Sequence, residues 1–153
     1  MFLGESAHTL DDKGRVFVPK RLQEGLSRAA DGTLVAYLTR GQDTCLYLFN
    51  EEGFQRALAE MNTRVFGAED VRAVQRVFFA NTTRAELDAS GRILIPEKLR
   101  ASAKLAKEIV MIGAGERAEI WARETWEKYE GANLKNLDRM DRVFSAPPAN
   151  EAN

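Results

Sequence analysis

The same pattern of apolar and polar positions occurs twice along the chain. Residues 10–22 (LDDKGRVFVPKRL) and residues 87–99 (LDASGRILIPEKL) align at a constant offset of 77. In each copy a polar turn is followed by three apolar residues and then by a proline. A repeat of this length predicts two copies of one supersecondary unit, close in space and related by an approximate two-fold axis. We expect four apolar residues to be buried between the copies: Val16, Val18, Ile93 and Ile95.

Downstream of the repeat, apolar segments on either side of glycine-containing turns predict one β-hairpin in each copy. The offset between the copies falls there from 77 to 72, because the first copy carries a longer loop. The expected strands are Leu34–Leu38 with Cys45–Phe49, and Ile109–Ile112 with Ala118–Trp121. Gly113-Ala114-Gly115 is interpreted as a hairpin turn rather than a phosphate loop, since no Gly-Lys-Ser/Thr follows it.

Helices are predicted from proline, capping residues and apolar spacing. Pro19 and Pro96 predict short helices over about 19–26 and 96–102, because proline suits the first helical position. Asn50, followed by two glutamates, is the expected N-cap of a longer helix. Apolar residues at spacings of three and four mark the faces of three longer helices. These residues are Phe54, Leu58 and Met61; Val71, Val74 and Phe78; and Trp126, Tyr129, Leu137, Met140 and Phe144.

The repeat also predicts the domain organisation. We expect a first module with its helix over residues 1–65, a helical linker over 66–81, and a second module with the C-terminal helix over 82–144. Residues 145–153 are small, polar and proline-bearing, which predicts a disordered tail. Short strands and several helices together indicate an α+β chain.

Composition restricts the classes of protein. The chain has 153 residues and a formal net charge of −1, so any anion-binding surface has to be local. Its single cysteine, Cys45, excludes an intramolecular disulfide and fits a reducing cytosol. The first ten residues lack the features of a signal peptide, and no apolar run approaches the roughly 20 residues of a membrane span. We expect a soluble cytoplasmic protein.

The polar turn of the repeat is the main candidate site. Gly14 and Gly91 are expected to supply a positive φ, and Asp11 and Asp88 to form the turns by binding backbone amides. Arg15 follows directly at the start of the apolar strand. It could merely form a surface ion pair with an aspartate of the turn. The repetition favours function instead, because a forked, always-charged guanidinium suits a phosphate group or a guanine edge.

Further cations follow the two prolines. Lys20 and Arg21 in the first copy, and Lys98 and Arg100 in the second, either form an ordinary solvated helix face or contact phosphates beside the turns. The copies are unequal, since the first has Lys13 and Lys20 where the second has Ser90 and Glu97. If both copies bind one anionic ligand, we expect the first copy to contribute more to the binding than the second.

Enzyme chemistry has little support in the sequence. His8 and Cys45 are the only residues of their types, and a Cys–His pair between them has no supporting motif. One of each cannot form a four-ligand zinc site of the usual kind, so no metal and no cofactor is expected. The aromatic pairs Phe49/Phe54 and Trp121/Trp126 could stack on bases, although matched aromatic residues are more often part of the core.

The repeat resembles the MraZ family of bacterial transcriptional regulators, whose members contain two swapped-hairpin SpoVT–AbrB DNA-binding modules. The resemblance covers roughly residues 1–130. The residues that carry it are the opening Met1-Phe2-Leu3-Gly4, the two D-x-x-x-R motifs with Pro19 and Pro96, and Glu119-Ile120-Trp121 followed by Trp126. It implies an α+β fold in which a pseudo-two-fold, AbrB-like swapped-hairpin β-barrel in double copy is flanked by helices.

The resemblance also implies a function. It implies a sequence-specific, nucleoid-associated repressor of its own division and cell-wall gene cluster, which binds direct promoter repeats in double-stranded DNA as a ring-shaped homo-oligomer. Asp11, Arg15, Asp88 and Arg92 match the family's motifs, and its arginines form the DNA-binding surface. Two alternatives stay open, namely an AbrB-like antitoxin and a scaffold ring without a role on DNA. The residues expected to bind DNA are Lys13, Arg15, Lys20, Arg21 and Arg92.

Overall fold

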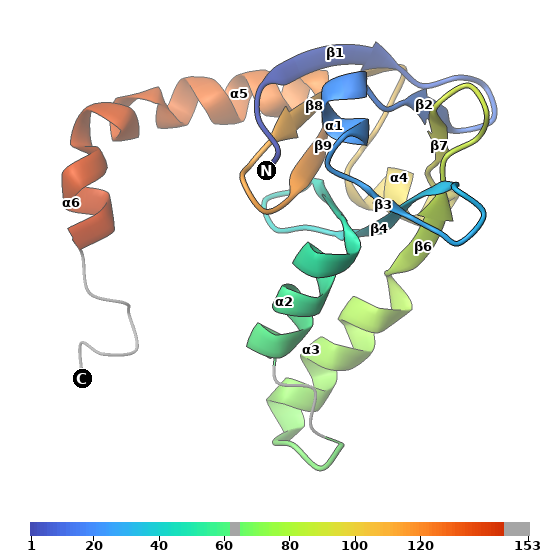
Figure 1. The fold of residues 1–153 in the computed structure, drawn as a ribbon. Coiled ribbons are helices and arrows are strands. Elements are labelled where there is room, and N and C mark those ends of the chain that lie inside the picture. Colours follow the sequence, from blue (N-terminus) through green and yellow to red (C-terminus); the bar gives the residue numbers. More distant parts are fainter. Residues whose placement is uncertain (62–64, 146–153) are drawn as a thin grey trace. The chain divides into compact units, whose positions relative to one another are not determined.

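Strands of the first copy pair with strands of the second in the computed structural model, which describes residues 1–61 and 65–145 (Figure 1). The elements of the first half are β1 (Glu5–Thr9), β2 (Arg15–Phe17), α1 (Lys20–Gln23), β3 (Ser27–Arg28), β4 (Leu34–Arg40), β5 (Leu46–Phe49) and α2 (Glu51–Met61). After α3 (Glu69–Ala80), the second half has β6 (Thr83–Glu86), β7 (Arg92–Leu94), α4 (Glu97–Ser102), β8 (Glu108–Gly113) and β9 (Ala118–Ala122). These elements belong to one compact unit, Met1–Arg123.

The main sheet exchanges its outer strands between the halves. Its order is β1-β8-β9-β5-β4-β3, and β6 also pairs with β4. Strand β1 of the first half therefore lies against β8 of the second, while β6 of the second half lies against β4 of the first. The predicted hairpins β4–β5 and β8–β9 are both present. The α+β class is confirmed, and the described pairings form an open path with β1 and β3 at its ends.

Two antiparallel pairings lie on the pseudo-two-fold axis. Strands β2 and β7 form a separate two-stranded sheet in which Val16 is opposite Ile93, its own equivalent in the repeat. Strands β5 and β9 pair with Tyr47 opposite Glu119, which are likewise equivalent at the offset of 72. A two-fold axis passes between two residues when each lies opposite its own repeat equivalent in an antiparallel ladder. The predicted symmetry is therefore confirmed.

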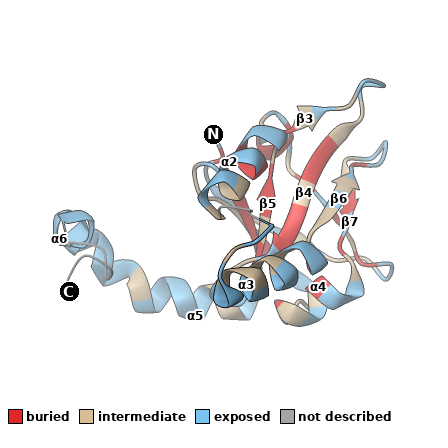
Figure 2. Cartoon of the chain, turned by 90° about the horizontal axis from the view of Figure 1, so that it is seen from below, coloured by how far each residue is buried: buried red, intermediate tan, exposed pale blue. Residues whose placement is uncertain are grey.

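The core fills the space between the halves, and β4 and β5 are largely buried (Figure 2). Val16, Val18, Ile93 and Ile95 are at most 1% exposed, as expected from the repeat. Strand β2 alternates between a buried Val16 and an exposed Phe17, and β7 between a buried Ile93 and an exposed Leu94. This alternation is typical of a strand with one face on the core.

Two local predictions are wrong in detail, and one strand was not predicted. Helix α1 ends at Gln23 rather than near residue 26, because the chain turns there to place β3 against β4. Pro19 and Pro96 are extended N-cap residues instead of first helical residues. The unpredicted strand β3 belongs to the longer loop that changes the offset between the copies.

Helix α2 begins as predicted. The Oδ1 atom of Asn50 accepts a hydrogen bond of 2.7 Å from the backbone N–H of Gly53, which satisfies one of the free amides at the helix start. Helices α2 and α3 meet through Phe54 and Phe78, whose ring centroids are 6.2 Å apart. On the predicted face of α3, Val71 and Phe78 are half-buried, whereas Val74 is exposed.

The second unit, Glu124–Asn153, is helical over its described part. The single helix expected there is divided into α5 (Arg123–Asn133), the 3-10 helix η1 (Leu134–Arg139) and α6 (Met140–Ser145). At the first break, the side-chain amide of Asn133 donates to the carbonyl of Tyr129. Such side-chain bonds compete with the helical ladder, which explains the break. The predicted tail beyond Ser145 lies outside the described residues.

We predict that the pairing on the axis dominates stability. Ile93→Ala should lower the free energy of unfolding by about 2–5 kcal/mol, because the side chain is fully buried and leaves a cavity. Leu94→Ala, on the exposed face of the same strand, should cost much less. Urea unfolding followed by circular dichroism measures both, and equal losses would contradict a core on the β2–β7 axis.

Candidate functional site

The first turn is organised around the carboxylate of Asp11. Its Oδ1 atom accepts hydrogen bonds from the backbone N–H groups of Lys13, at 2.9 Å, and Arg15, at 2.8 Å. Its Oδ2 atom accepts a 2.8 Å hydrogen bond from Nε of Arg15. The backbone N–H of Asp11 donates to the carbonyl of Arg15, which closes the turn. Asp11 therefore fixes both the turn and the direction of the guanidinium.

The second turn repeats this arrangement. Asp88 Oδ1 accepts from the backbone N–H groups of Ser90 and Arg92, at 2.9 and 3.0 Å. Its Oδ2 atom accepts from Nε of Arg92 at 3.0 Å. In both turns the aspartate therefore accepts backbone hydrogen bonds within the turn and forms an ion pair with the arginine of its own motif.

Gly14 and Gly91 have φ angles of +79° and +78°. This left-handed conformation is unfavourable for other residues, so a glycine is required at both positions. Each glycine carbonyl also accepts a hydrogen bond from the other half, from the N–H of Ile95 to Gly14 and from that of Val18 to Gly91, both 2.9 Å. The turns are thus joined to each other as well as to their own strands.

The two motifs meet at Asp11. Its Oδ2 atom is 2.8 Å from Nε of Arg15 and 3.8 Å from Nη1 of Arg92 in the second motif. The side chains of Arg15 and Arg92 are about one-third exposed, at 31% and 36%. Within the described part of the chain, no hydrogen bond involves the terminal nitrogens of either arginine. A planar anion could therefore bind to the outer edge of two adjacent guanidinium groups.

The turns lower the pKa of both aspartates. For Asp11 and Asp88, the main cause is the hydrogen bond donated by the backbone N–H of the motif's own arginine, which favours the charged carboxylate. Both groups stay ionised at neutral pH, so the ion pairs and the turn geometry persist under those conditions.

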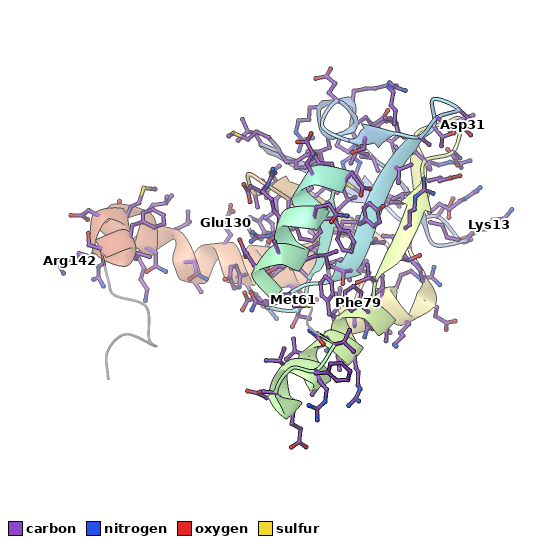
Figure 3. All side chains as sticks on the ribbon, turned by 60° about the horizontal axis from the view of Figure 1, so that its bottom comes forward. Lys13, Asp31, Met61, Phe79, Glu130 and Arg142 are labelled. Atoms are coloured by element: carbon purple, nitrogen blue, oxygen red, sulfur yellow. The ribbon has the colours of Figure 1, made fainter. Side chains whose placement is uncertain are left out.

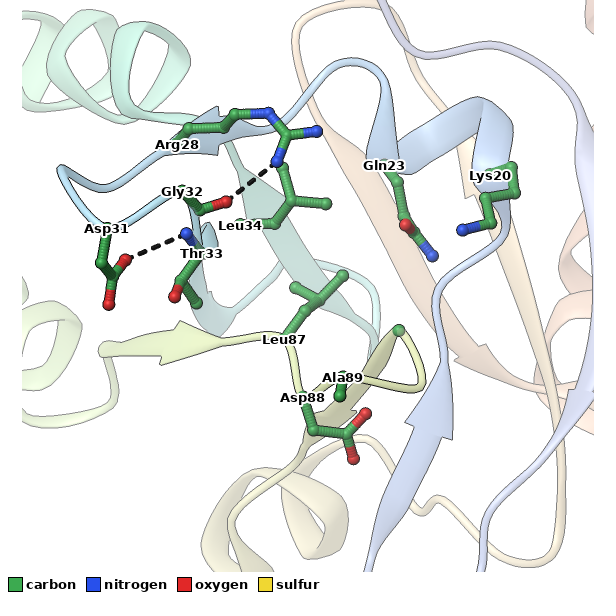
Figure 4. Close-up of a pocket in the computed structure, with 11 residues that line it drawn as sticks. Lys20, Gln23, Arg28, Asp31, Gly32, Thr33, Leu34, Leu87, Asp88 and Ala89 are labelled. Atoms are coloured by element: carbon green, nitrogen blue, oxygen red, sulfur yellow. Dashed lines mark hydrogen bonds between the residues drawn. The ribbon is translucent and has the colours of Figure 1, made fainter.

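The remaining predicted cations lie in different places. Lys13 is exposed at the tip of the first turn and extends away from the ribbon (Figure 3). Lys20 belongs to the first copy, yet it lines a pocket of about 510 Å³ with Asp88, Ala89 and Gly91 of the second turn (Figure 4). Arg21 donates to the carbonyl of Leu3 at 3.0 Å, and in the described chain no hydrogen bond or ion pair joins it to the turns.

One relationship was not predicted from the sequence. Arg100 of α4 lies against Gly14, and Gln23 of α1 lies against Gly91. These two residues are equivalent at the offset of 77, so the repeat alignment could have paired them. Their contact with the opposite turn could not be deduced, because it depends on how the halves cross.

The residues considered for enzyme chemistry have other roles. The thiol of Cys45 is buried and donates to the carbonyl of Gln42, and burial raises its pKa to about 12, which removes the nucleophilic thiolate at neutral pH. His8 is hydrogen-bonded to Ser6.

The aromatic residues Phe49, Phe54 and Trp121 are buried, which confirms that they are part of the core. Residues 1–61 and 65–145 contain no cluster of three or more His, Cys, Asp or Glu side chains suited to a metal.

No helix in the described ranges combines the length and the apolar character that a membrane span requires.

Comparisons with known proteins identify relatives over most of the chain. A family model described as "MraZ protein, putative antitoxin-like" matches residues 1–77 and again residues 78–144. A protein named transcriptional regulator MraZ from Heliobacterium modesticaldum is 46% identical over 129 residues, which are 84% of this chain and 86% of that protein. Proteins of the same name are 41% identical in Moorella thermoacetica, with 84% and 86% coverage, and in Desulforamulus reducens, with 92% and 94% coverage.

We predict a loss of stability in acid that depends on Asp11. The folded-state pKa of its carboxyl lies below the unfolded value of about 3.9, so its stabilising effect is complete above that value. The effect is lost as the pH falls through the lowered pKa. The stability difference between the parent and Asp11→Asn should therefore be present at pH 7 and shrink below about pH 4. Urea unfolding at several pH values measures this difference.

Asp12→Asn provides the matched control, because Asp12 is the exposed neighbour of Asp11 in the same turn. A pH-independent difference for Asp11→Asn, or an equal effect of Asp12→Asn, would contradict the assigned role of Asp11.

Proposed function

Because the chain belongs to the MraZ family of transcriptional regulators, we propose that it regulates transcription by binding double-stranded DNA with its two Asp-x-x-Gly-Arg turns. One observation carries this proposal: the guanidinium groups of Arg15 and Arg92 lie side by side at a single carboxylate. Forked, always-charged cations suit a phosphate group or the acceptor edge of a guanine. A regulator of transcription needs no catalytic group, which points to a protein that is not an enzyme.

The distribution of charge supports a local DNA-binding surface. The net charge of the chain is −1, so attraction of DNA has to come from residues at the turns. We propose that Arg15, Lys13 and Arg92 contact DNA directly, with additional contacts from Lys20 and Arg21. Asp11 and Asp88 act indirectly by fixing the turns, as do Gly14 and Gly91.

The two turns differ in the number of nearby cations. This difference is smaller in the structure than in the sequence, where Lys13 and Lys20 both belong to the first copy. Lys13 adds a charge to the first turn, where the second has Ser90. Lys20, counted with the first copy, lies beside the second turn. Each DNA-binding turn therefore combines residues of both halves, and we expect the first turn to remain the stronger because of Lys13.

Assembly would compensate for the few cations of one subunit. Joining several subunits on one DNA raises the overall affinity by roughly 10²–10⁴ without new contacts. Unlike surfaces that meet head to tail form a ring where the rotation between neighbouring subunits closes. Val74 and Val77 of α3 are more than half exposed, and with Phe78 they line a pocket of about 420 Å³, which supports contact with a second copy. We propose a ring-shaped homo-oligomer whose subunits contain the modules 1–65 and 82–144, joined by the helical linker 66–81.

A ring offers the same turns repeatedly along its circumference, so its natural operator is a set of direct repeats. We propose that such repeats lie in the promoter of the chain's own division and cell-wall gene cluster, that occupancy represses transcription, and that the protein is found at the nucleoid. A gel shift with the upstream region, at a stated salt concentration, tests this directly.

We predict that Arg15→Ala abolishes most of the binding to that region. Removing a contact made by both arms of a guanidinium costs about 1–3 kcal/mol per subunit, and an oligomer multiplies the loss. Circular dichroism and oligomer size should not change. Arg56→Ala, which removes the same charge from α2, should bind normally. Affinity of the parent should fall steeply with added salt. Normal binding by Arg15→Ala would indicate a scaffold ring or a different DNA surface.

A second prediction concerns assembly. Val77→Asp places a charge in the exposed apolar face of α3, so it should shift the protein towards smaller species in light scattering with size-exclusion chromatography. Val65→Asp adds the same charge outside α3 and should leave the size unchanged. A parent protein that is a stable monomer, or an unchanged size for Val77→Asp, would contradict the proposed subunit contact.

A further inference from the structure

Arg100 of the second half supports the turn of the first half through a hydrogen bond and close packing against Gly14, an arrangement that we call a brace. Its Nη1 atom donates a 2.7 Å hydrogen bond to the carbonyl of Ile95. Its guanidinium also occupies the space beside Gly14, since a Cβ atom built on that glycine would lie 1.5 Å from Nη1. The N–H of Ile95 in turn donates to the carbonyl of Gly14 at 2.9 Å. Arg100 thus links the end of β7 to the glycine between Lys13 and Arg15.

Gln23 of the first half makes the equivalent contacts on the second turn. Its Nε2 atom donates a 2.7 Å hydrogen bond to the carbonyl of Val18, and the N–H of Val18 donates to the carbonyl of Gly91. A Cβ atom on Gly91 would lie 2.6 Å from Nε2 of Gln23. The same brace is therefore built twice, with a charged side chain at the first turn and a neutral side chain at the second.

We propose that Arg100 and Gln23 are positioning residues, each of which holds the DNA-binding turn of the opposite half in its active geometry. This inference rests on the proposed DNA binding. The use of a neutral amide at the second turn indicates that the brace works through hydrogen bonding and space filling rather than through charge. Arg15 is then presented correctly only when α4 of the second half is in place.

The test compares Arg100→Gln, Arg100→Ala and the parent in binding a DNA duplex spanning the chain's own upstream region, at several salt concentrations. Arg100→Gln should bind within about twofold of the parent, because glutamine can make the same contacts that Gln23 makes and because Arg100 is half-buried and hydrogen-bonded to Ile95 within the fold. Arg100→Ala should bind roughly two- to tenfold more weakly per engaged subunit, since the turn is no longer preordered. The salt slope should be the same for all three proteins.

Hydrogen exchange gives a second measurement that does not depend on DNA. The amides of Lys13 and Arg15 should exchange faster in Arg100→Ala and unchanged in Arg100→Gln, while Gln23→Ala should instead affect the amides of Ser90 and Arg92. This paired variant keeps the proposal testable if Arg100→Ala does not fold.

Three outcomes would overturn the positioning role. One is unchanged binding and exchange in Arg100→Ala. The second is an equal loss in Arg100→Gln and Arg100→Ala with a salt slope reduced by about 1 per subunit, which would make Arg100 a direct phosphate contact. The third is exchange in Gln23→Ala that is unchanged at Ser90 and Arg92. A parent that does not bind the duplex would refute the proposed function instead, and the exchange data would still decide whether the brace exists.

Discussion

The pairing of β2 with β7 across the pseudo-two-fold axis is the constraint on which the rest of the structure depends. Each strand has only three residues, so its backbone groups and its apolar side chains need a partner that its own half does not supply. Once Val16 faces Ile93, the flanking turns are brought together and their glycine carbonyls accept hydrogen bonds from the opposite strand. The core and the candidate site therefore arise from one pairing: its buried face stabilises the fold, and its ends present the arginines.

Much of this could be deduced from the sequence, because a repeat carries information about symmetry. The apolar runs and the turn residues predict the β2–β7 unit, the hairpins and the roles of Asp11 and Asp88. The exchange of β1 and β6 could not be deduced, since a strand pattern reports which face is buried but not which strand is the neighbour. For the same reason, the sequence places Lys20 in the first copy but does not reveal that it lies beside the second turn. The divided C-terminal helix reflects a side-chain bond of Asn133 that apolar spacing does not encode.

Duplication within one chain allows the two halves to differ in sequence. In a symmetric dimer of single modules, by contrast, the two copies are identical. Lys13 and Ser90 occupy equivalent positions, as do Arg100 and Gln23, yet each pair differs in charge. Because the turns and their braces come from opposite halves, a substitution in one copy changes the site formed by the other. Divergence of the copies can therefore adjust the two proposed DNA-binding turns separately while the shared core stays the same.

The exchanged strands also have a consequence during synthesis on the ribosome. Glu5 of β1 pairs with Ile112 of β8, so the first strand of the chain has no partner until the last hairpin has been made. At roughly 5–20 residues per second, that interval is on the order of 5–20 seconds. During this interval the backbone groups of β1 that later pair with β8 have no partner from that strand. The same edge that later pairs with β8 of its own chain is then available to β8 of a neighbouring nascent chain, and that pairing would produce an intertwined pair instead of a correctly folded subunit.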